Sequence, residues 1–173
     1  DPVSLGVLAA PAEYGADIVV GSIQPLGVHM HCGGGVGGFI ASRDEPRYAY
    51  EYPTLLLSAT ETTELGEIGF GLSLMHQTSY GSREKGKDWT GNSTYLWAIA
   101  GAVYMSMMGP MGFRELGEVL VQRSHYAARI LNAIDGVQVK FPSGFFKEFV
   151  VNVDGTKRTI ADLNRFLLKE GIF

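Results

Sequence analysis

The chain has 173 residues, of which 46% are hydrophobic and 18% charged, and its formal net charge is −4 at pH 7. This composition is typical of a globular protein with one substantial core and excludes a disordered chain. The basic residues are scattered along the sequence, so we expect no nucleic acid and no anionic membrane as a partner. With Cys32 as the single cysteine, and with no leader or long apolar run, we expect a cytoplasmic protein without an internal disulfide.

The first third of the sequence predicts two strands with a glycine-dense loop between them. Residues 3–10 are compatible with a short helix, and a buried strand is expected at 16–20 and a second strand at 38–42. In α/β enzymes such loops bring backbone close to a ligand, because only glycine tolerates positive φ and close approach without a Cβ penalty. The loop has neither the G-x-G-x-x-G pattern nor a P-loop lysine, which argues against a nucleotide-phosphate site.

Leucine and glycine patterns distinguish the next segment. Residues 55–57 are three leucines, which suit either a short strand or a packed loop, and both stay open. In residues 66–74 glycine alternates with Ile68, Phe70, Leu72 and Leu74, which is the period of a strand. One face of this strand is nearly bare, which indicates close approach of another backbone or of a ligand.

Two helices are predicted next. Residues 95–108 form an apolar run rich in alanine and methionine, which predicts a buried helix with its N-cap in the polar residues 92–94. This helix should end at Gly109-Pro110. From Met111 to Asp135, apolar residues recur at three- and four-residue intervals, which predicts an amphipathic helix.

The C-terminal part predicts two strands and a last helix. The strands are expected at residues 137–141 and 145–153, around a turn at 142–144. Thr159 is expected to cap a helix at residues 160–169, because Asp162 in its first turn complements the helix dipole.

Three segments of the chain, in sequence order, resemble the P-protein family of the glycine cleavage system, the decarboxylating glycine dehydrogenases, and specifically subunit 1 of the two-subunit form. They are residues 15–26 with Gly33, Gly34 and 38–39, then residues 69–74 with 83–85, and then residues 102–116. The resemblance spans nearly the whole chain and implies a segment of a much longer polypeptide.

This resemblance also implies a fold. It is the α/β fold of the fold-type-I, aspartate-aminotransferase-like transferases that depend on pyridoxal phosphate (PLP). Residues 1–110 would form the C-terminal half of the large domain, residues 111–135 a linking helix, and residues 136–173 the start of the small α+β domain.

In the family's catalytic subunit, PLP is held as a Schiff base on the lysine of a His-Lys pair, just after the strand that corresponds to residues 17–20. Gln24 and Pro25 stand at the matching positions, and proline has no amine for a Schiff base. The resemblance therefore implies that PLP is bound in the partner subunit and not covalently here. The lysines elsewhere are expected on the surface: Lys85, Lys87, Lys140, Lys147, Lys157 and Lys169.

The implied function is that of the non-cofactor subunit of glycine decarboxylase, which supports PLP-dependent glycine decarboxylation and aminomethyl transfer to the lipoyl H-protein. The implied partners are glycine dehydrogenase subunit 2 and the H-protein, in an oligomer, and this segment alone is expected to be inactive. No residue stands out as catalytic. The candidates for a pocket or an interface are Gln24, Gly33, Gly34, Arg83 and Lys85.

Arg83 and Lys85 flank Glu84 in a polar loop bordered by glycine. A basic pair in such a place can meet a carboxylate, a phosphate or a partner subunit. The alternative is an ion-paired loop that fixes the following helix.

A cluster of His29, His31 and Cys32 lies in the glycine-dense loop. It lacks a fourth ligand and the usual spacing of a metal site, so we expect no metal and an inert Cys32 thiol.

Two loops depart from the family pattern, at residues 29–32 and 86–93. Both are expected to border the subunit interface or the mouth of the active site, where a changed charge and shape alter substrate choice. Three alternatives therefore stay open. They are a paralogue that acts on another amino acid, a self-contained PLP enzyme whose lysine lies elsewhere, and a non-catalytic structural or regulatory subunit.

Overall fold

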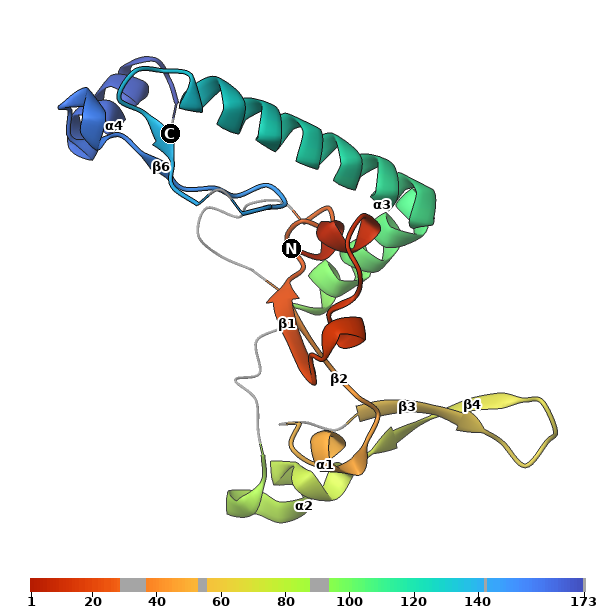
Figure 1. Ribbon diagram of the computed structural model, residues 1–173. Coiled ribbons are helices and arrows are strands. Elements are labelled where there is room, and N and C mark those ends of the chain that lie inside the picture. The colour runs from red at the N-terminus through yellow and green to blue at the C-terminus, as the bar shows by residue number, and fades with distance from the viewer. Residues whose placement is uncertain (29–36, 53–55, 88–93, 142, 173) are drawn as a thin grey trace. The chain divides into compact units, whose positions relative to one another are not determined.

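The computed structural model describes residues 1–28, 37–52, 56–87, 94–141 and 143–172 (Figure 1). These residues form two compact units. One unit consists of Asp1–Ala9 with Met105–Phe173, and the other is Ala10–Tyr104. Helices and strands are mixed along the chain, in agreement with the predicted α/β composition, and the strand pairs within the described residues are antiparallel.

In the unit Ala10–Tyr104, a first ribbon follows the one-turn helix η2 (Pro11–Tyr14) and precedes the short helix α1 (Pro46–Ala49). Its strands are β1 (Ile18–Ser22) and β2 (Gly38–Ser42), and Val20 lies opposite Ile40. The second strand has the predicted bounds, whereas β1 starts two residues later than expected. The prediction that β1 is buried is wrong, because Ile18 is 54% and Val20 69% exposed. A two-stranded ribbon covers neither of its own faces, and no other described element covers this one.

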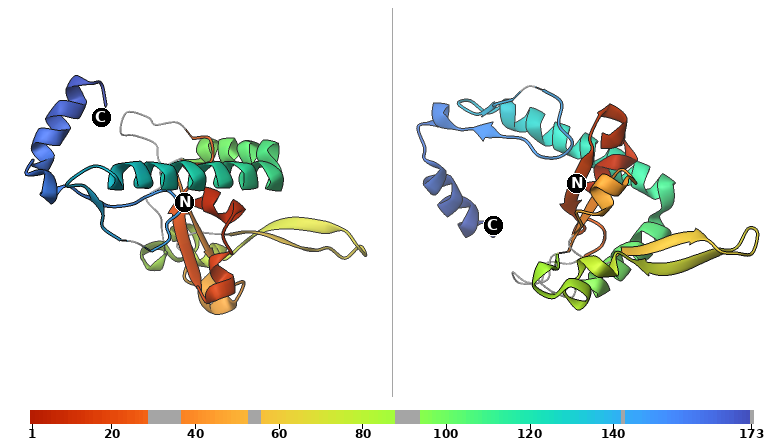
Figure 2. Two further views of the ribbon diagram at one scale, coloured as in Figure 1. Left: turned by 45° about the horizontal axis from the view of Figure 1, so that its top comes forward. Right: turned by 90° about the horizontal axis from the view of Figure 1, so that it is seen from below.

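A long hairpin follows, formed by β3 (Leu56–Glu61) and β4 (Ile68–Ser73). The leucine run is therefore strand, and the glycine-alternating segment is the strand that its period predicts. The hairpin projects from the rest of its unit in all three views (Figures 1 and 2). The expected close approach at its bare face is not found among the described residues, since a Cβ at Gly71 would meet nothing within 4 Å.

Three single-turn helices complete this part of the chain directly after β4. They are η3 (Met75–Gln77), α2 (Ser79–Ser82) and η4 (Arg83–Lys85). We call the segment from Met75 to Lys87 the helical knot.

The longest element, α3, covers Tyr95–Asn132 and is interrupted at Gly109, where φ is 58° and ψ is −179°. This backbone is non-helical and Pro110 follows it, so the prediction of two helices that meet at Gly109-Pro110 is confirmed. The prediction that the first of them is buried is wrong. Leu96 is 74% exposed, and other apolar side chains of the same half are exposed too: Ile99, Val103 and Met107.

By length and composition alone, α3 is also apolar enough to cross a membrane, with a mean hydropathy of 1.2 over 18 residues. The expectation that no apolar run is long enough was therefore too strict. One such helix is weak evidence for a span, because the core helix of a globular protein has the same composition.

The N-terminal part of the other unit is a single turn of helix, η1 (Pro2–Gly6), within the residues that suit a short helix. Asp1 caps it, because its Oδ1 accepts a 2.9 Å hydrogen bond from the Val3 amide. A Cβ at Gly6 would lie 2.3 Å from the carbonyl oxygen of Phe113, so glycine allows this turn to pack directly on α3.

The C-terminal elements are β5 (Gln138–Val139), β6 (Val151–Asn152), η5 (Asp154–Thr156) and α4 (Ile160–Lys169). The helix has the predicted bounds and the predicted cap, but both strands are much shorter than predicted. The reason is that carbonyl groups of the segment between them bind α3. Ser124 Oγ donates to the Phe146 carbonyl at 2.9 Å, and His125 Nε2 lies 2.9 Å from the Phe145 carbonyl.

Candidate functional site

The turn after β1 carries the two residues at the expected cofactor position, Gln24 and Pro25. The Gln24 amide donates to Ser22 Oγ at 3.1 Å, and the Leu26 amide donates to the Ile23 carbonyl at 2.9 Å. Leu26 is buried, and so is Val28, whose amide donates to the Gln24 carbonyl. These bonds give the turn a defined shape.

Gly27 explains how this turn fits against the helix of its own unit. Its φ is 79°, and a Cβ there would lie only 2.8 Å from the Tyr104 ring. Glycine is therefore required twice at this position, for the left-handed backbone and for the close approach of the ring.

The chemistry of the turn does not fit a covalently bound PLP. Gln24 and Pro25 are partly exposed but neither has an amine, and a Schiff base requires one. Lys87 of the same unit has another role, since its Nζ donates to the Tyr50 carbonyl at 2.6 Å and to Glu51 Oε2 at 2.9 Å. The other candidates of this region lie outside the described residues: Gly33, Gly34, His29, His31 and Cys32. No three metal-ligating side chains gather in the part of the chain that the structure describes.

The helical knot brings backbone against backbone. Thr78 is fully buried and its Oγ1 donates to the Met75 carbonyl at 2.8 Å, while the Lys87 amide donates to the Gln77 carbonyl. A Cβ at Gly86 would lie 2.4 Å from the Ser79 amide nitrogen. Little freedom remains for the residues in between.

Arg83 lies inside this constrained segment, with φ 49° and ψ −120°. This is a conformation that L-residues rarely adopt and that costs of the order of 1–3 kcal/mol. Arg83, Glu84 and Lys85 are all exposed, and none of them forms an ion pair with another described residue. The alternative of an ion-paired loop therefore finds no support in the described part, and the two cations remain available.

Sequence reasoning missed the contacts that hold the knot to the segment before the hairpin. The Tyr50 carbonyl accepts from Gln77 Nε2 at 2.8 Å and from Lys87 Nζ, across 27 and 37 positions of sequence. Gln77 Oε1 is buried and has no donor among the described residues. No local pattern indicates such long-range bonds to a main-chain carbonyl.

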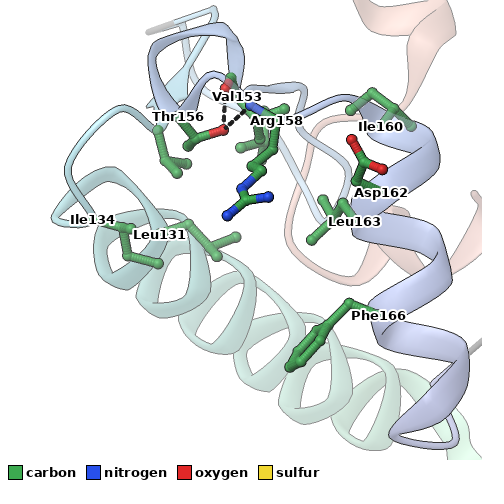
Figure 3. A pocket seen from close by; sticks show the side chains of 11 residues that line it. Leu131, Ile134, Val153, Thr156, Arg158, Ile160, Asp162, Leu163 and Phe166 are labelled. Atoms are coloured by element: carbon green, nitrogen blue, oxygen red, sulfur yellow. Dashed lines mark hydrogen bonds between the residues drawn. The ribbon is translucent and has the colours of Figure 1, made fainter.

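Sequence reasoning also missed a cavity of about 730 Å³ in the other unit, between the end of α3, β6 and α4 (Figure 3). Apolar side chains from α3 and α4 face it, among them Leu131, Leu163 and Phe166, and the Arg158 side chain reaches into the space between the helices. Asp162 lies at its edge, but its carboxylate is used by Thr159, whose Oγ1 and amide both donate to it. The cavity suits apolar contact and offers no acid–base pair.

Comparisons with known proteins agree on one family. Residues 1–169 match the sequence model of the family described as glycine cleavage system P-protein. The chain is similar to proteins named "Probable glycine dehydrogenase (decarboxylating) subunit 1". It is 37% identical to the one from Desulforamulus reducens over 172 residues, which are 99% of this chain and 37% of the relative. The relative from Chlorobium limicola is 38% identical over 173 residues, which are 100% of this chain and 38% of the relative.

A solved structure agrees as well. It is the crystal structure of glycine decarboxylase (P-protein) of the glycine cleavage system in inhibitor-bound form, with a TM-score of 0.84 and 35% sequence identity. The match covers 99% of this chain and 38% of that chain. The chain thus spans less than two fifths of the length of each of these proteins.

Proposed function

The chain belongs to the glycine cleavage system P-protein family, and from that premise we propose that it is a segment of subunit 1 of a two-subunit glycine decarboxylase, the subunit that holds no covalent PLP. Its fold would be that of the aspartate-aminotransferase-like transferases, divided at residues 110 and 135 as the resemblance implies. The enzyme would be cytoplasmic and would pass the aminomethyl group of glycine to the lipoyl H-protein.

The observation that supports this role is the turn at Gln24 and Pro25. Its backbone is well formed, with Leu26 buried and Gly27 packed against Tyr104, yet it offers no amine. A turn that has decayed at random would be expected to lose shape and chemistry together. Here the shape is kept and only the cofactor-binding group is absent, which is what a partner of a catalytic subunit requires. We therefore assign PLP to glycine dehydrogenase subunit 2.

The contribution of this chain would then come from groups that contact the partner or line its pocket. Arg83 and Lys85 are exposed cations held on a constrained backbone, suited to bind a carboxylate of the partner subunit or an anionic group at its active site. The Gln24 amide can both donate and accept hydrogen bonds at the pocket wall. Gly33 and Gly34 would allow backbone to approach the same pocket.

Glycine-dependent exchange of labelled bicarbonate tests this function, with lipoylated H-protein present and with full-length proteins throughout. The arms are the polypeptide that contains this segment, its partner subunit, and the two mixed. We expect exchange in the mixture alone. Exchange by this polypeptide alone would show a self-contained PLP enzyme and overturn the assignment.

Two further outcomes of the same assay are informative. Full exchange by the partner subunit alone would reduce this chain to a structural or regulatory role. No exchange in any arm, with both proteins folded and a control enzyme active, would indicate a paralogue that acts on another amino acid.

A further inference from the structure

The β3–β4 hairpin has two chemically different faces. In an antiparallel pair, residues opposite one another point to the same side of the sheet. Leu57 lies opposite Leu72, Ala59 opposite Phe70, and Glu61 opposite Ile68. These pairs share one side, and we call its apolar part, Leu57, Ala59, Ile68, Phe70 and Leu72, the apolar hairpin face. The other side carries small or polar residues, such as Thr60 opposite Gly69 and Ser58 opposite Gly71.

The apolar hairpin face is not covered by the described residues. Its large side chains are exposed by 70% at Leu57, 62% at Ile68, 76% at Phe70 and 60% at Leu72. Four such side chains on one strip approach the few hundred Å² that a monomer rarely leaves open without a function. An isolated two-stranded hairpin is also marginally stable by itself, so a cover on this face would stabilise the strands.

The base of the hairpin is fixed, which makes it a rigid projection and not a loose loop. The Tyr50 carbonyl precedes β3, and it accepts hydrogen bonds from Gln77 and Lys87, which follow β4. An interface element held in this way loses little conformational entropy when it binds.

Charge is distributed unevenly along the hairpin. Exposed glutamates lie at its tip, namely Glu61, Glu64 and Glu67. Exposed cations lie in the helical knot at its base, Arg83 and Lys85. A complementary surface would therefore have an apolar groove with basic residues at one end and acidic residues at the other.

We propose that the apolar hairpin face is the surface on which this chain docks onto its partner subunit, and this inference rests on the proposed function. The similar proteins are named subunit 1, so an assembly with a second kind of subunit is the setting in which the face must be covered. The face also continues into the knot, whose free cations extend the same surface. The partner supplies an apolar groove with basic residues opposite the glutamates of the tip and acidic residues opposite Arg83 and Lys85.

The first test uses full-length subunit 1 titrated with its partner subunit and followed by sedimentation velocity. Phe70→Glu places a carboxylate in the centre of the apolar hairpin face and should weaken assembly about 100-fold or more. Thr60→Glu adds the same charge to the opposite face of the same hairpin and should change the dissociation constant less than about threefold. Wild-type assembly that persists unchanged in Phe70→Glu would overturn the inference while leaving the proposed function intact.

A second measurement covers the case in which Phe70→Glu does not fold. Leu72→Cys and Thr60→Cys, each in a Cys32→Ser background, are reacted with a maleimide before and after addition of the partner. We expect Leu72→Cys to react in free subunit 1 and to be protected in the complex, and Thr60→Cys to react in both. Protection of Leu72→Cys in free monomeric subunit 1 would show that its own polypeptide covers the face, and protection in a homo-oligomer would assign it to a second copy. Either result overturns the inference. Failure of the wild-type subunits to assemble overturns it together with the function on which it rests.

Discussion

The turn at Arg83 and the start of α4 at Thr159 are built in opposite ways. At Thr159 every local preference agrees with the structure, because its hydroxyl accepts from the Asp162 amide at 3.1 Å and the Asp162 carboxylate binds back to the Thr159 amide. At Arg83 the residue type and the backbone disagree, since φ is 49° in a residue with a Cβ.

The difference indicates where function is to be sought. Local sequence and structure usually agree, and conflicts that persist are concentrated at functional positions. The conflict at Arg83 persists because the surrounding knot fixes it, and it presents an unpaired cation to solvent. The start of α4 is a structural stop with no such conflict. Four measurements separate these two roles.

The largest effect is expected from Arg83→Ala, which removes the cation and leaves the backbone unchanged. We expect the exchange activity of the two-subunit mixture to fall at least about tenfold, equivalent to about 1.4 kcal/mol. Arg47→Ala is the matched control, an exposed arginine of the same unit that pairs with Glu45 at 2.7 Å, and it should retain activity. Full activity of Arg83→Ala would remove Arg83 from the proposed interface.

Thr159→Ala should weaken the start of α4 by about 1 kcal/mol, the usual cost of losing an N-cap side chain. Amide hydrogen exchange in the first turn of the helix would then accelerate about fivefold, without a change in activity. Asn164→Ala, at an exposed position of the same helix, should not accelerate exchange. Loss of activity in Thr159→Ala would contradict a purely structural role.

Arg83→Gly is expected to stabilise its unit by up to about 1 kcal/mol, because glycine adopts this backbone without strain although it adds entropy to the unfolded chain. The activity of the mixture should fall as in Arg83→Ala. The slowed exchange of the amides around Thr78 measures the gain. A less stable Arg83→Gly variant would show that the conformation is not strained.

The smallest effect concerns acid. The pKa of Asp162 lies below its ordinary value, because the Thr159 hydroxyl and then the Thr159 amide donate hydrogen bonds to the carboxylate. A lowered pKa in the folded state means that this stabilisation is present above the unfolded pKa, near 3.9, and is lost as the pH falls through the folded pKa. The carboxyl chemical shift should report a lowered pKa that returns toward the ordinary value in Thr159→Ala. An unchanged titration in that variant would refute the stated cause.

Features with a local signal could be predicted from the sequence. The break of α3 at Gly109, the strand β2 and the capped helix α4 lie where residue types alone indicate them. Each depends on residues within one turn or one strand of the feature itself.

Features that depend on distant parts of the chain could not be predicted. Apolar Val20 and Leu96 indicate burial, but burial requires a cover, and no described element provides it. The predicted strand at residues 145–153 is shortened because its first carbonyls bind Ser124 and His125 of α3. At the candidate site, an arginine gives no indication of positive φ, so the conflict at Arg83 becomes visible only in the structure.

Trapping the cofactor in the assembled full-length enzyme tests the central claim most directly. The complex, loaded with PLP, is reduced with borohydride, and the pyridoxyl-lysine is located by mass spectrometry of both subunits. The account predicts the modified lysine in the partner subunit and an unmodified lysine set in this chain, since Pro25 occupies the expected position. A stoichiometric pyridoxyl group on the polypeptide that contains this segment would contradict it.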